Sequence, residues 1–182
     1  MIYVFLAPGF EEIEALAVVD VLRRAELDVL TVGVGEDFVI GSHQIPVAAD
    51  ISEKNLILDE RVEAIVLPGG MPGTLNLEKS PVVQKAIDWA VENDKLICAI
   101  CAAPSILGHK ELLEGKKATC FPGFEEELFG AEVSKDFVVK DGKFITAKGM
   151  GSAVEFGLQI AEILTNPLEV KKIRASLQIF NG

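Results

Sequence analysis

The chain has 182 residues, of which 49% are hydrophobic and 25% charged, so it can bury a core without disulfides or metals and we expect one folded domain over residues 1–182. Its formal net charge is −11, which disfavours nucleic acid and anionic membranes as partners, because both attract clustered Lys and Arg. A small-molecule ligand stays compatible with this charge, because the local field of a site can differ from the overall charge.

The N-terminal half alternates short apolar runs with stretches of helical period. The run at 2–6 is continuously apolar and ends at Pro8, which is typical of a strand buried on both faces. From Glu12 onward, apolar residues recur at the spacing of an amphipathic helix. The predicted elements of this half are a strand at 2–6, a helix at 12–24, a strand at 29–32, and a hairpin with strands at 38–40 and 44–47.

The C-terminal half repeats this alternation. Ser80 and Pro81 are a typical N-cap and first residue of a helix, and Asp141-Gly142 is a strong turn pair. The predicted elements of this half are strands at 64–67, 96–100 and 118–121, a hairpin with strands at 137–140 and 143–146, a short helix around 125–127, and longer helices at 81–93, 153–164 and 167–175.

Buried strands that alternate with helices predict an α/β fold with a mostly parallel sheet covered on both faces. Ligands of such folds bind beyond the carboxyl ends of the strands. Three predicted strand ends carry unusual residues: the segment 7–14, the glycine-rich segment 68–73, and Cys101. We expect these three segments to converge on one site.

Cys101 is the candidate nucleophile. A thiol reacts as thiolate, and a cysteine between a strand end and a helix start lies near the positive end of the helix dipole, which is expected to lower its pKa. A tight turn from strand to helix would also project the side chain into the crevice. The alternative is an inert buried cysteine, since free Cys often acts as a small hydrophobic residue.

Glu14 is the candidate proton carrier. It lies beside the apolar face of its helix, so it can be buried, protonated and able to donate to a thiolate. The alternative is an ordinary acid in the first turn of the helix, where it interacts with the helix dipole. We favour this second interpretation for Glu11 and Glu12.

The amides of Gly69, Gly70 and Ala102 are candidate donors to an oxyanion. The alternative for the two glycines is an ordinary turn.

Four segments resemble the DJ-1/PfpI superfamily, in its DJ-1/ThiJ branch, in order and spacing over about residues 1–166. The resemblance implies a flavodoxin-like three-layer sandwich, usually a homodimer, with an oxidation-prone cysteine hydrogen-bonded to a protonated glutamate. It also implies glyoxalase- or deglycase-like lyase or hydrolase chemistry on small reactive aldehydes. The segments are APGFEEIE at 7–14, LPGGMPG at 67–73, AICAAP at 99–104 and TAKGMGS at 146–152.

Two positions depart from relatives that carry a Cys-His pair. Ala102 stands where protease-like members have His directly after the cysteine, and Phe121 stands before Pro122, where DJ-1 has His. Amide hydrolysis by a thiolate needs a general acid for the leaving amine. The sequence therefore disfavours a cysteine peptidase or amidase.

The remaining cysteines point to free thiols. An odd number of cysteines, three, in a chain without a visible basic leader indicates a reducing compartment, and we expect a cytoplasmic protein. Cys98 lies inside a predicted strand, so we expect it in the core rather than in a dithiol motif with Cys101. Cys120 is a candidate resolving thiol.

The two histidines carry weaker hypotheses. His43, in the predicted hairpin, is expected at the surface or in a dimer contact, with a role at the rim of the site as the alternative. His109 is expected as a packing or helix-end residue. We find no metal-ligand set and no phosphate or dinucleotide fingerprint, and we expect no metal and no cofactor.

Two functions fit a reactive Cys101. One is turnover of small carbonyl compounds through a hemithioacetal. The other is an oxidative-stress sensor or protective protein, in which Cys101 is oxidised to sulfinate without turnover. Both require an accessible thiol, so the sequence leaves them open.

Overall fold

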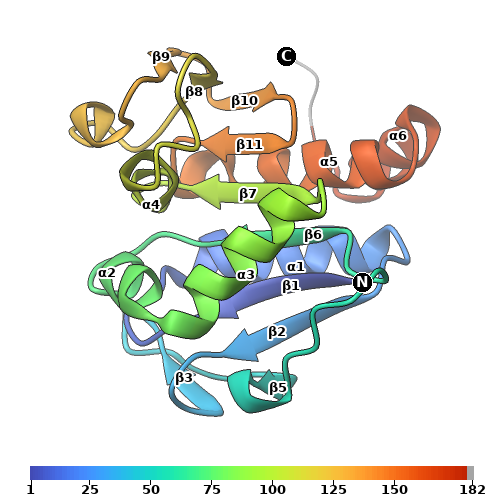
Figure 1. The fold of residues 1–182 in the computed structure, drawn as a ribbon. Helices are drawn as coiled ribbons and strands as arrows, with labels where there is room; N and C mark the ends of the chain where they lie inside the picture. Colours follow the sequence, from blue (N-terminus) through green and yellow to red (C-terminus); the bar gives the residue numbers. More distant parts are fainter. Residues whose placement is uncertain (180–182) are drawn as a thin grey trace.

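The computed structural model describes residues 1–179 and is built around a mainly parallel sheet (Figure 1). Seven strands lie in the order β10-β11-β7-β6-β1-β2-β5, and only β10 runs antiparallel to its neighbour. The predicted α/β fold with helices on both faces is confirmed. The strands are β1 (Ile2–Leu6), β2 (Val29–Gly33), β5 (Ile51–Ser52), β6 (Ala64–Leu67), β7 (Leu96–Ile100), β10 (Val138–Asp141) and β11 (Phe144–Ala147).

Each face of the sheet is covered by its own set of helices. One layer holds α1 (Glu12–Arg24), α5 (Ala153–Leu164) and α6 (Pro167–Ser176), and the other holds α2 (Gly73–Lys79), α3 (Pro81–Glu92) and α4 (Pro104–His109). The side chains of β1 divide between the two cores because successive residues of a strand point to opposite faces. The residues Ile2, Val4 and Leu6 face the α1 layer, and Tyr3 and Phe5 face the α3 layer.

Several short elements lie outside the main sheet and the helices that cover it. A hairpin of β3 (Phe38–Ile40) and β4 (Pro46–Ala48) extends beyond the sheet, and β8 (Lys117–Ala118) pairs with β9 (Glu132–Val133). Three short 3-10 helices are η1 (Glu53–Asn55), η2 (Glu125–Glu127) and η3 (Met150–Ser152). No helix among residues 1–179 is long and apolar enough to cross a bilayer.

Most predicted elements are confirmed, and the differences concern short ones. The second hairpin strand begins at Pro46 rather than at residue 44, because Gln44 has a φ of 65° and belongs to the turn. The strand predicted at 118–121 spans only Lys117–Ala118. The structure adds β5, β9 and α2, which are too short to carry a periodic pattern.

The order of the strands places three loops next to one another. β7, β6 and β1 are parallel neighbours, so their carboxyl ends meet at one edge of the sheet. Figure 1 shows the arrowheads of β1 and β7 pointing toward the same edge. The predicted convergence of the segment 7–14, the segment 68–73 and Cys101 is therefore confirmed.

Candidate active site

Cys101 occupies a strained turn directly after β7. Its φ is 66°, in the left-handed region that non-glycine residues rarely adopt. Residues held in such rare conformations cluster at functional sites. Two backbone hydrogen bonds fix this turn: the Cys101 N–H donates to the Ala147 carbonyl, and the Cys101 carbonyl accepts from the Phe121 N–H, each at 2.8 Å. The thiol is partly exposed at the edge of the sheet.

Glu14 reaches the same point from the first turn of α1, where it is only 1% exposed. Its Oε2 accepts the Gly69 N–H at 3.0 Å, and its carboxyl also hydrogen-bonds the Cys101 side chain. A Cβ at position 69 would lie 2.6 Å from the Cβ of Cys101 and 2.7 Å from Oε2 of Glu14. Gly69 therefore lets the acid and the thiol approach each other.

The burial of Glu14 favours its protonated form. Removal of the carboxyl from water raises its pKa to about 7, and the negative charge of Glu11 acts in the same direction. Hydrogen bonds from Cys101, Gly69 and Met150 lower the pKa and offset only part of this effect. Near neutral pH the carboxyl can therefore both donate and accept a proton.

The expectation that position alone lowers the Cys101 pKa is wrong. Burial, together with the negative charge and the hydrogen bond of Glu14, raises the pKa of the thiol to about 12. The helix is also less favourably placed than expected, because α4 begins at Pro104 rather than directly after Cys101. The contribution from charge exists only while Glu14 is ionised, so the two groups titrate as a pair.

The three predicted amide donors divide into two roles. The Gly69 N–H is already bound to Glu14, whereas the N–H groups of Ala102 and Gly70 hydrogen-bond the Cys101 sulfur and favour its thiolate. Gly70 has a φ of 91°, and a Cβ there would lie 2.4 Å from the backbone nitrogen of Glu11. Oxyanion binding stays a prediction for the N–H groups of Gly70 and Ala102. The Gly69 N–H instead binds the Glu14 carboxyl.

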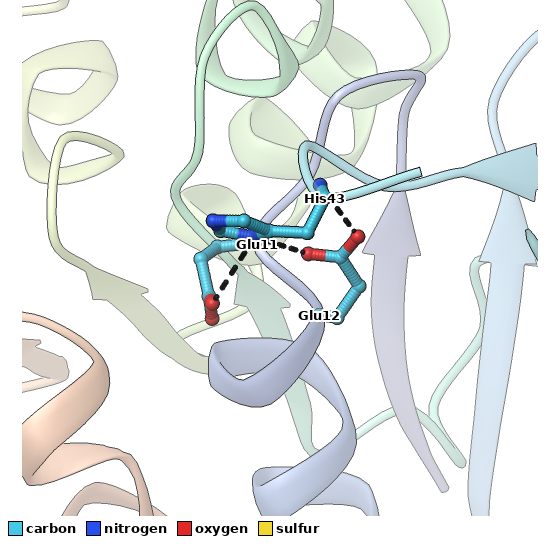
Figure 2. Close-up of side chains that lie close together, drawn as sticks. All are labelled: Glu11, Glu12 and His43. Carbon is cyan, nitrogen blue, oxygen red and sulfur yellow. Dashed lines mark hydrogen bonds and ion pairs between the residues drawn. The ribbon is translucent and has the colours of Figure 1, made fainter. Parts of the chain in front are cut away.

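Glu11 and Glu12 are not the solvated first-turn acids that the sequence suggested. Both are buried, at 9% and 2% exposure, because the β3–β4 hairpin folds over the start of α1. Glu11 caps the helix by accepting the Glu14 N–H at 2.6 Å. Glu12 accepts the backbone N–H of His43 at 2.8 Å and lies 3.0 Å from its Nδ1 (Figure 2).

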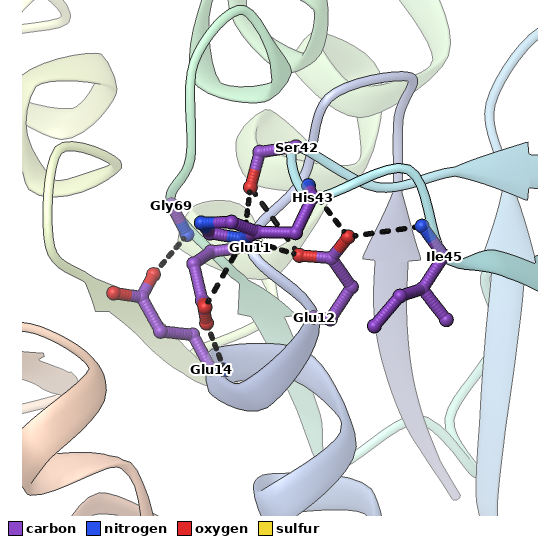
Figure 3. A network of polar contacts seen from close by, with 7 residues as sticks. All are labelled: Glu11, Glu12, Glu14, Ser42, His43, Ile45 and Gly69. Carbon is purple, nitrogen blue, oxygen red and sulfur yellow. Dashed lines mark hydrogen bonds and ion pairs between the residues drawn. The ribbon is translucent and has the colours of Figure 1, made fainter.

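This network joins the hairpin turn to the site (Figure 3). Glu12 also accepts from the Ser42 hydroxyl at 3.3 Å and from the Ile45 N–H at 3.4 Å. Ligand atoms of Glu11, Glu12 and His43 lie within 4.8 Å of one another, the one such group among residues 1–179. Both oxygens of Glu12 are already committed to hydrogen bonds, so the network is accounted for as a clamp on the hairpin.

Both histidines are held by glutamates. The His43 side chain is 70% exposed, which confirms its expected surface position; a role at the rim of the site stays a prediction. His109 is the last residue of α4, and its two ring nitrogens hydrogen-bond the carboxylates of Glu78 and Glu127. The expected position of His109 at the end of a helix is therefore confirmed. Neither histidine completes a Cys-His pair through these contacts.

The other cysteines are buried. Cys98 is fully buried in β7, as expected, and this burial raises its pKa far above the usual range. Cys120 is 3% exposed, and burial raises its pKa to about 11. A resolving role for Cys120 stays a prediction.

An apolar pocket beside the thiol was not predicted from the sequence. It has a volume of 390 Å³ and is formed by segments around Phe121, Phe137 and Met150. Phe121, which stands at the position of the absent histidine, is 48% exposed. A large aromatic at the last position of the strand predicted at 118–121 was the available signal.

Comparisons with known proteins agree with this geometry. The sequence pattern of the DJ-1/PfpI family matches residues 1–163. Protein dj-1beta of Drosophila melanogaster is 36% identical over 179 residues, which cover 97% of this chain and 95% of the relative. The glutathione-independent glyoxalase DJR-1.2 of Caenorhabditis elegans is 34% identical over 160 residues, which cover 86% of this chain and 84% of the relative.

Solved structures show the same likeness. The crystal structure of Drosophila melanogaster DJ-1beta superposes with a TM-score of 0.92 at 33% identity, covering 98% of this chain and 97% of the other. Oxidized DJ-1 of Toxoplasma gondii also gives a TM-score of 0.92, at 34% identity and 97% coverage of both chains.

Proposed function

The chain belongs to the DJ-1/PfpI family, and we propose that it is a cysteine-dependent enzyme that acts on small reactive aldehydes, with 2-oxoaldehydes such as methylglyoxal as substrates. The observation that carries this proposal is the buried carboxyl of Glu14, which hydrogen-bonds the Cys101 side chain and has a pKa raised to about 7. The name of the nematode relative, a glutathione-independent glyoxalase, supports the same chemistry.

The first step is addition to the aldehyde. Ionised Glu14 takes the proton of the Cys101 thiol, the sulfur forms a bond to the aldehyde carbon, and the electron pair of the carbonyl moves to oxygen. The Gly70 and Ala102 amides, which hydrogen-bond the sulfur, are close enough to stabilise the negative charge that develops on that oxygen. Glu14 delivers this proton to the oxygen, so the product is a neutral hemithioacetal and Glu14 is ionised again.

The second step moves hydrogen between neighbouring carbons. Ionised Glu14 removes the proton from the former aldehyde carbon and delivers it to the oxygen of the adjacent ketone, which gives an enediol. Glu14 then transfers the hydroxyl proton of the former aldehyde carbon to the second carbon, and the product is a 2-hydroxyacyl thioester of Cys101. Water then cleaves the thioester to lactate and the free thiol, so the net reaction is methylglyoxal plus water to lactate, without an external oxidant or glutathione.

The test is a steady-state assay of methylglyoxal loss together with lactate formation. We expect Cys101→Ser to abolish turnover and Glu14→Gln to reduce it by about a hundredfold or more, because general acid–base catalysis contributes on that scale. Turnover by the wild type no higher than that of Cys101→Ser would refute the proposal.

A second candidate is a sensor or protective role through oxidation of Cys101. The partly exposed thiol and the amides around its sulfur favour it, and one similar structure is named as oxidized. Glu14 and the amides would then hold a sulfinate. Graded peroxide followed by mass spectrometry tests this role; equal oxidation of Cys98, Cys101 and Cys120 would count against it.

We also propose that the chain acts as a cytoplasmic homodimer. Ile13, Ile40 and Ile45 are 49%, 48% and 51% exposed, and they lie around the Glu12 network, where they form an apolar surface next to the site. The free thiols of the described residues fit a reducing compartment. Light scattering on Ile13→Lys tests the dimer, with a halved mass expected; an unchanged mass would exclude this face as the interface.

A further inference from the structure

The proposed reaction leaves the apolar pocket beside Cys101 without a role. Its volume of 390 Å³ falls within the roughly 300–1,000 Å³ of small-molecule sites. Its wall is made by the rings of Phe121 and Phe137 and the side chain of Met150, which are 48%, 68% and 55% exposed. Methylglyoxal carries only a methyl group, so it would leave most of this surface in contact with water.

Two residues that line the pocket, Phe121 and Gly149, lie next to the reacting groups. A Cβ at Gly149 would lie 3.3 Å from Cδ2 of Phe121 and 3.7 Å from Oε1 of Glu14, so the phenyl ring and the carboxyl both lie close to this glycine. The Phe121 N–H also donates to the Cys101 carbonyl at 2.8 Å. The Phe121 ring therefore lies near the Glu14 carboxyl, next to the same glycine.

The outer wall is held in place from a different segment. The Nζ of Lys148 lies 5.2 Å from the centroid of the Phe137 ring, in a cation–π contact. Lys148 and Phe137 both line the pocket. The pocket therefore has two aromatic walls, one next to Glu14 and one toward solvent.

We propose that this pocket binds the aromatic substituent of an aryl 2-oxoaldehyde and that Phe121 is a specificity-determining residue. The inference rests on the proposed function, because it names the substrate class of that same site. Ring–ring contact with Phe121 would bury the substituent while the adjacent carbonyl carbons lie at Cys101 and Glu14. Aromatic pairs are favoured beyond the area that they bury, so an aryl substrate gains over methylglyoxal.

The first test compares phenylglyoxal with methylglyoxal as substrates. We expect kcat/KM of the wild type to favour phenylglyoxal, and Phe121→Ala to lower this ratio on the order of fivefold. Phe129→Ala is the matched control: Phe129 is 47% exposed but packs on His109, outside the pocket, so the ratio should stay unchanged. Equal ratios in wild type and Phe121→Ala would overturn the inference.

The second test does not depend on turnover. Iodoacetanilide and iodoacetamide both alkylate a thiolate with loss of iodide, and only the first carries a phenyl ring. We expect the ratio of their rates at Cys101, read by peptide mass spectrometry, to exceed the ratio for glutathione and to fall severalfold in Phe121→Ala. The same ratio in wild type, Phe121→Ala and glutathione refutes the pocket even if methylglyoxal is turned over. A Phe121-dependent ratio without turnover supports the pocket and refutes the glyoxalase proposal.

Discussion

Gly69 holds the carboxyl of Glu14 through its backbone N–H, at 3.0 Å from Oε2, and at the same time leaves the space in which that carboxyl meets Cys101. A side chain at position 69 would collide with both groups, since its Cβ would lie 2.6 Å from the Cβ of Cys101 and 2.7 Å from Oε2 of Glu14. The close approach of the Glu14 carboxyl and the Cys101 thiol therefore requires a residue without a Cβ at position 69.

The first prediction is that Gly69→Ala disrupts the pair. We expect a loss of about 1–3 kcal/mol in the free energy of unfolding, which is typical of overpacking, measured by urea denaturation. Alkylation of Cys101 should also change, because the carboxyl must move. Gly151→Ala is the stability control, because a Cβ there meets nothing within 4 Å. Equal stability of the two variants would show that the loop relaxes freely.

The convergence of the three strand ends could be predicted from the sequence because it follows from local patterns. Continuous apolar runs indicate parallel strands, and parallel neighbours bring their carboxyl ends to one edge. This placed Glu14 and Cys101 together before their contact was observed. The direction of the Cys101 pKa could not be predicted in this way, since burial and the charge of Glu14 raise it and both arise from tertiary packing.

The burial of Glu12 and the pocket at Phe121 were missed for a related reason. Glu12 is covered by the turn around His43, which is 31 positions away in the sequence. The pocket joins Phe121 and Phe137, which lie in two separate loops, to Met150, which begins η3. Periodicity reports the environment within one element and carries no information about such distant neighbours.

The second prediction concerns the clamp between Glu12 and the hairpin turn. Glu12→Ala removes the charged acceptor of the part-buried N–H groups of His43 and Ile45, so we expect a loss of about 1–3 kcal/mol in the free energy of unfolding. His43→Ala keeps those backbone bonds to Glu12 and removes a ring that is 70% exposed, so it should destabilise the fold less than Glu12→Ala does. Equal losses in the two variants would contradict the assignment of the clamp to backbone donors.

The third prediction uses Glu14 to tune the thiol. The charge of ionised Glu14 raises the Cys101 pKa, and Glu14→Gln removes that charge while it keeps a hydrogen-bonding side chain of the same size. We expect the pKa of Cys101 to be lower in Glu14→Gln than in the wild type, measured from the pH dependence of Cys101 alkylation. The amide of Gln can donate a hydrogen bond to the thiolate and Leu cannot, so the Cys101 pKa in Glu14→Leu should lie above that in Glu14→Gln. Identical pH profiles of Cys101 alkylation in all three proteins would show that Glu14 does not act on the thiol and is an ordinary acid in the first turn of its helix.

The fourth prediction follows from the raised pKa of Glu14 and concerns stability. Burial raises this pKa from an ordinary 4.5 to about 7, so between these values the folded chain keeps a proton that the unfolded chain has released. Stability contributed by this group is therefore fully present below about pH 4.5, falls as the pH rises toward 7, and stays constant above. The full change is on the order of 3 kcal/mol.

Glu14→Gln cannot release this proton, so it isolates the effect. Carboxyl groups that do not interact with Glu14 contribute equally to both proteins and cancel in the difference. We expect the free energy of unfolding of Glu14→Gln, relative to the wild type, to rise by about 3 kcal/mol between pH 4 and pH 8, measured by urea denaturation at each pH. Glu36→Gln, at an exposed glutamate, is measured in parallel as the control for the loss of one carboxylate. A constant difference between Glu14→Gln and wild type would mean that Glu14 ionises as readily in the folded chain as in the unfolded one, and the proton carrier of the proposed reaction would have to be another group.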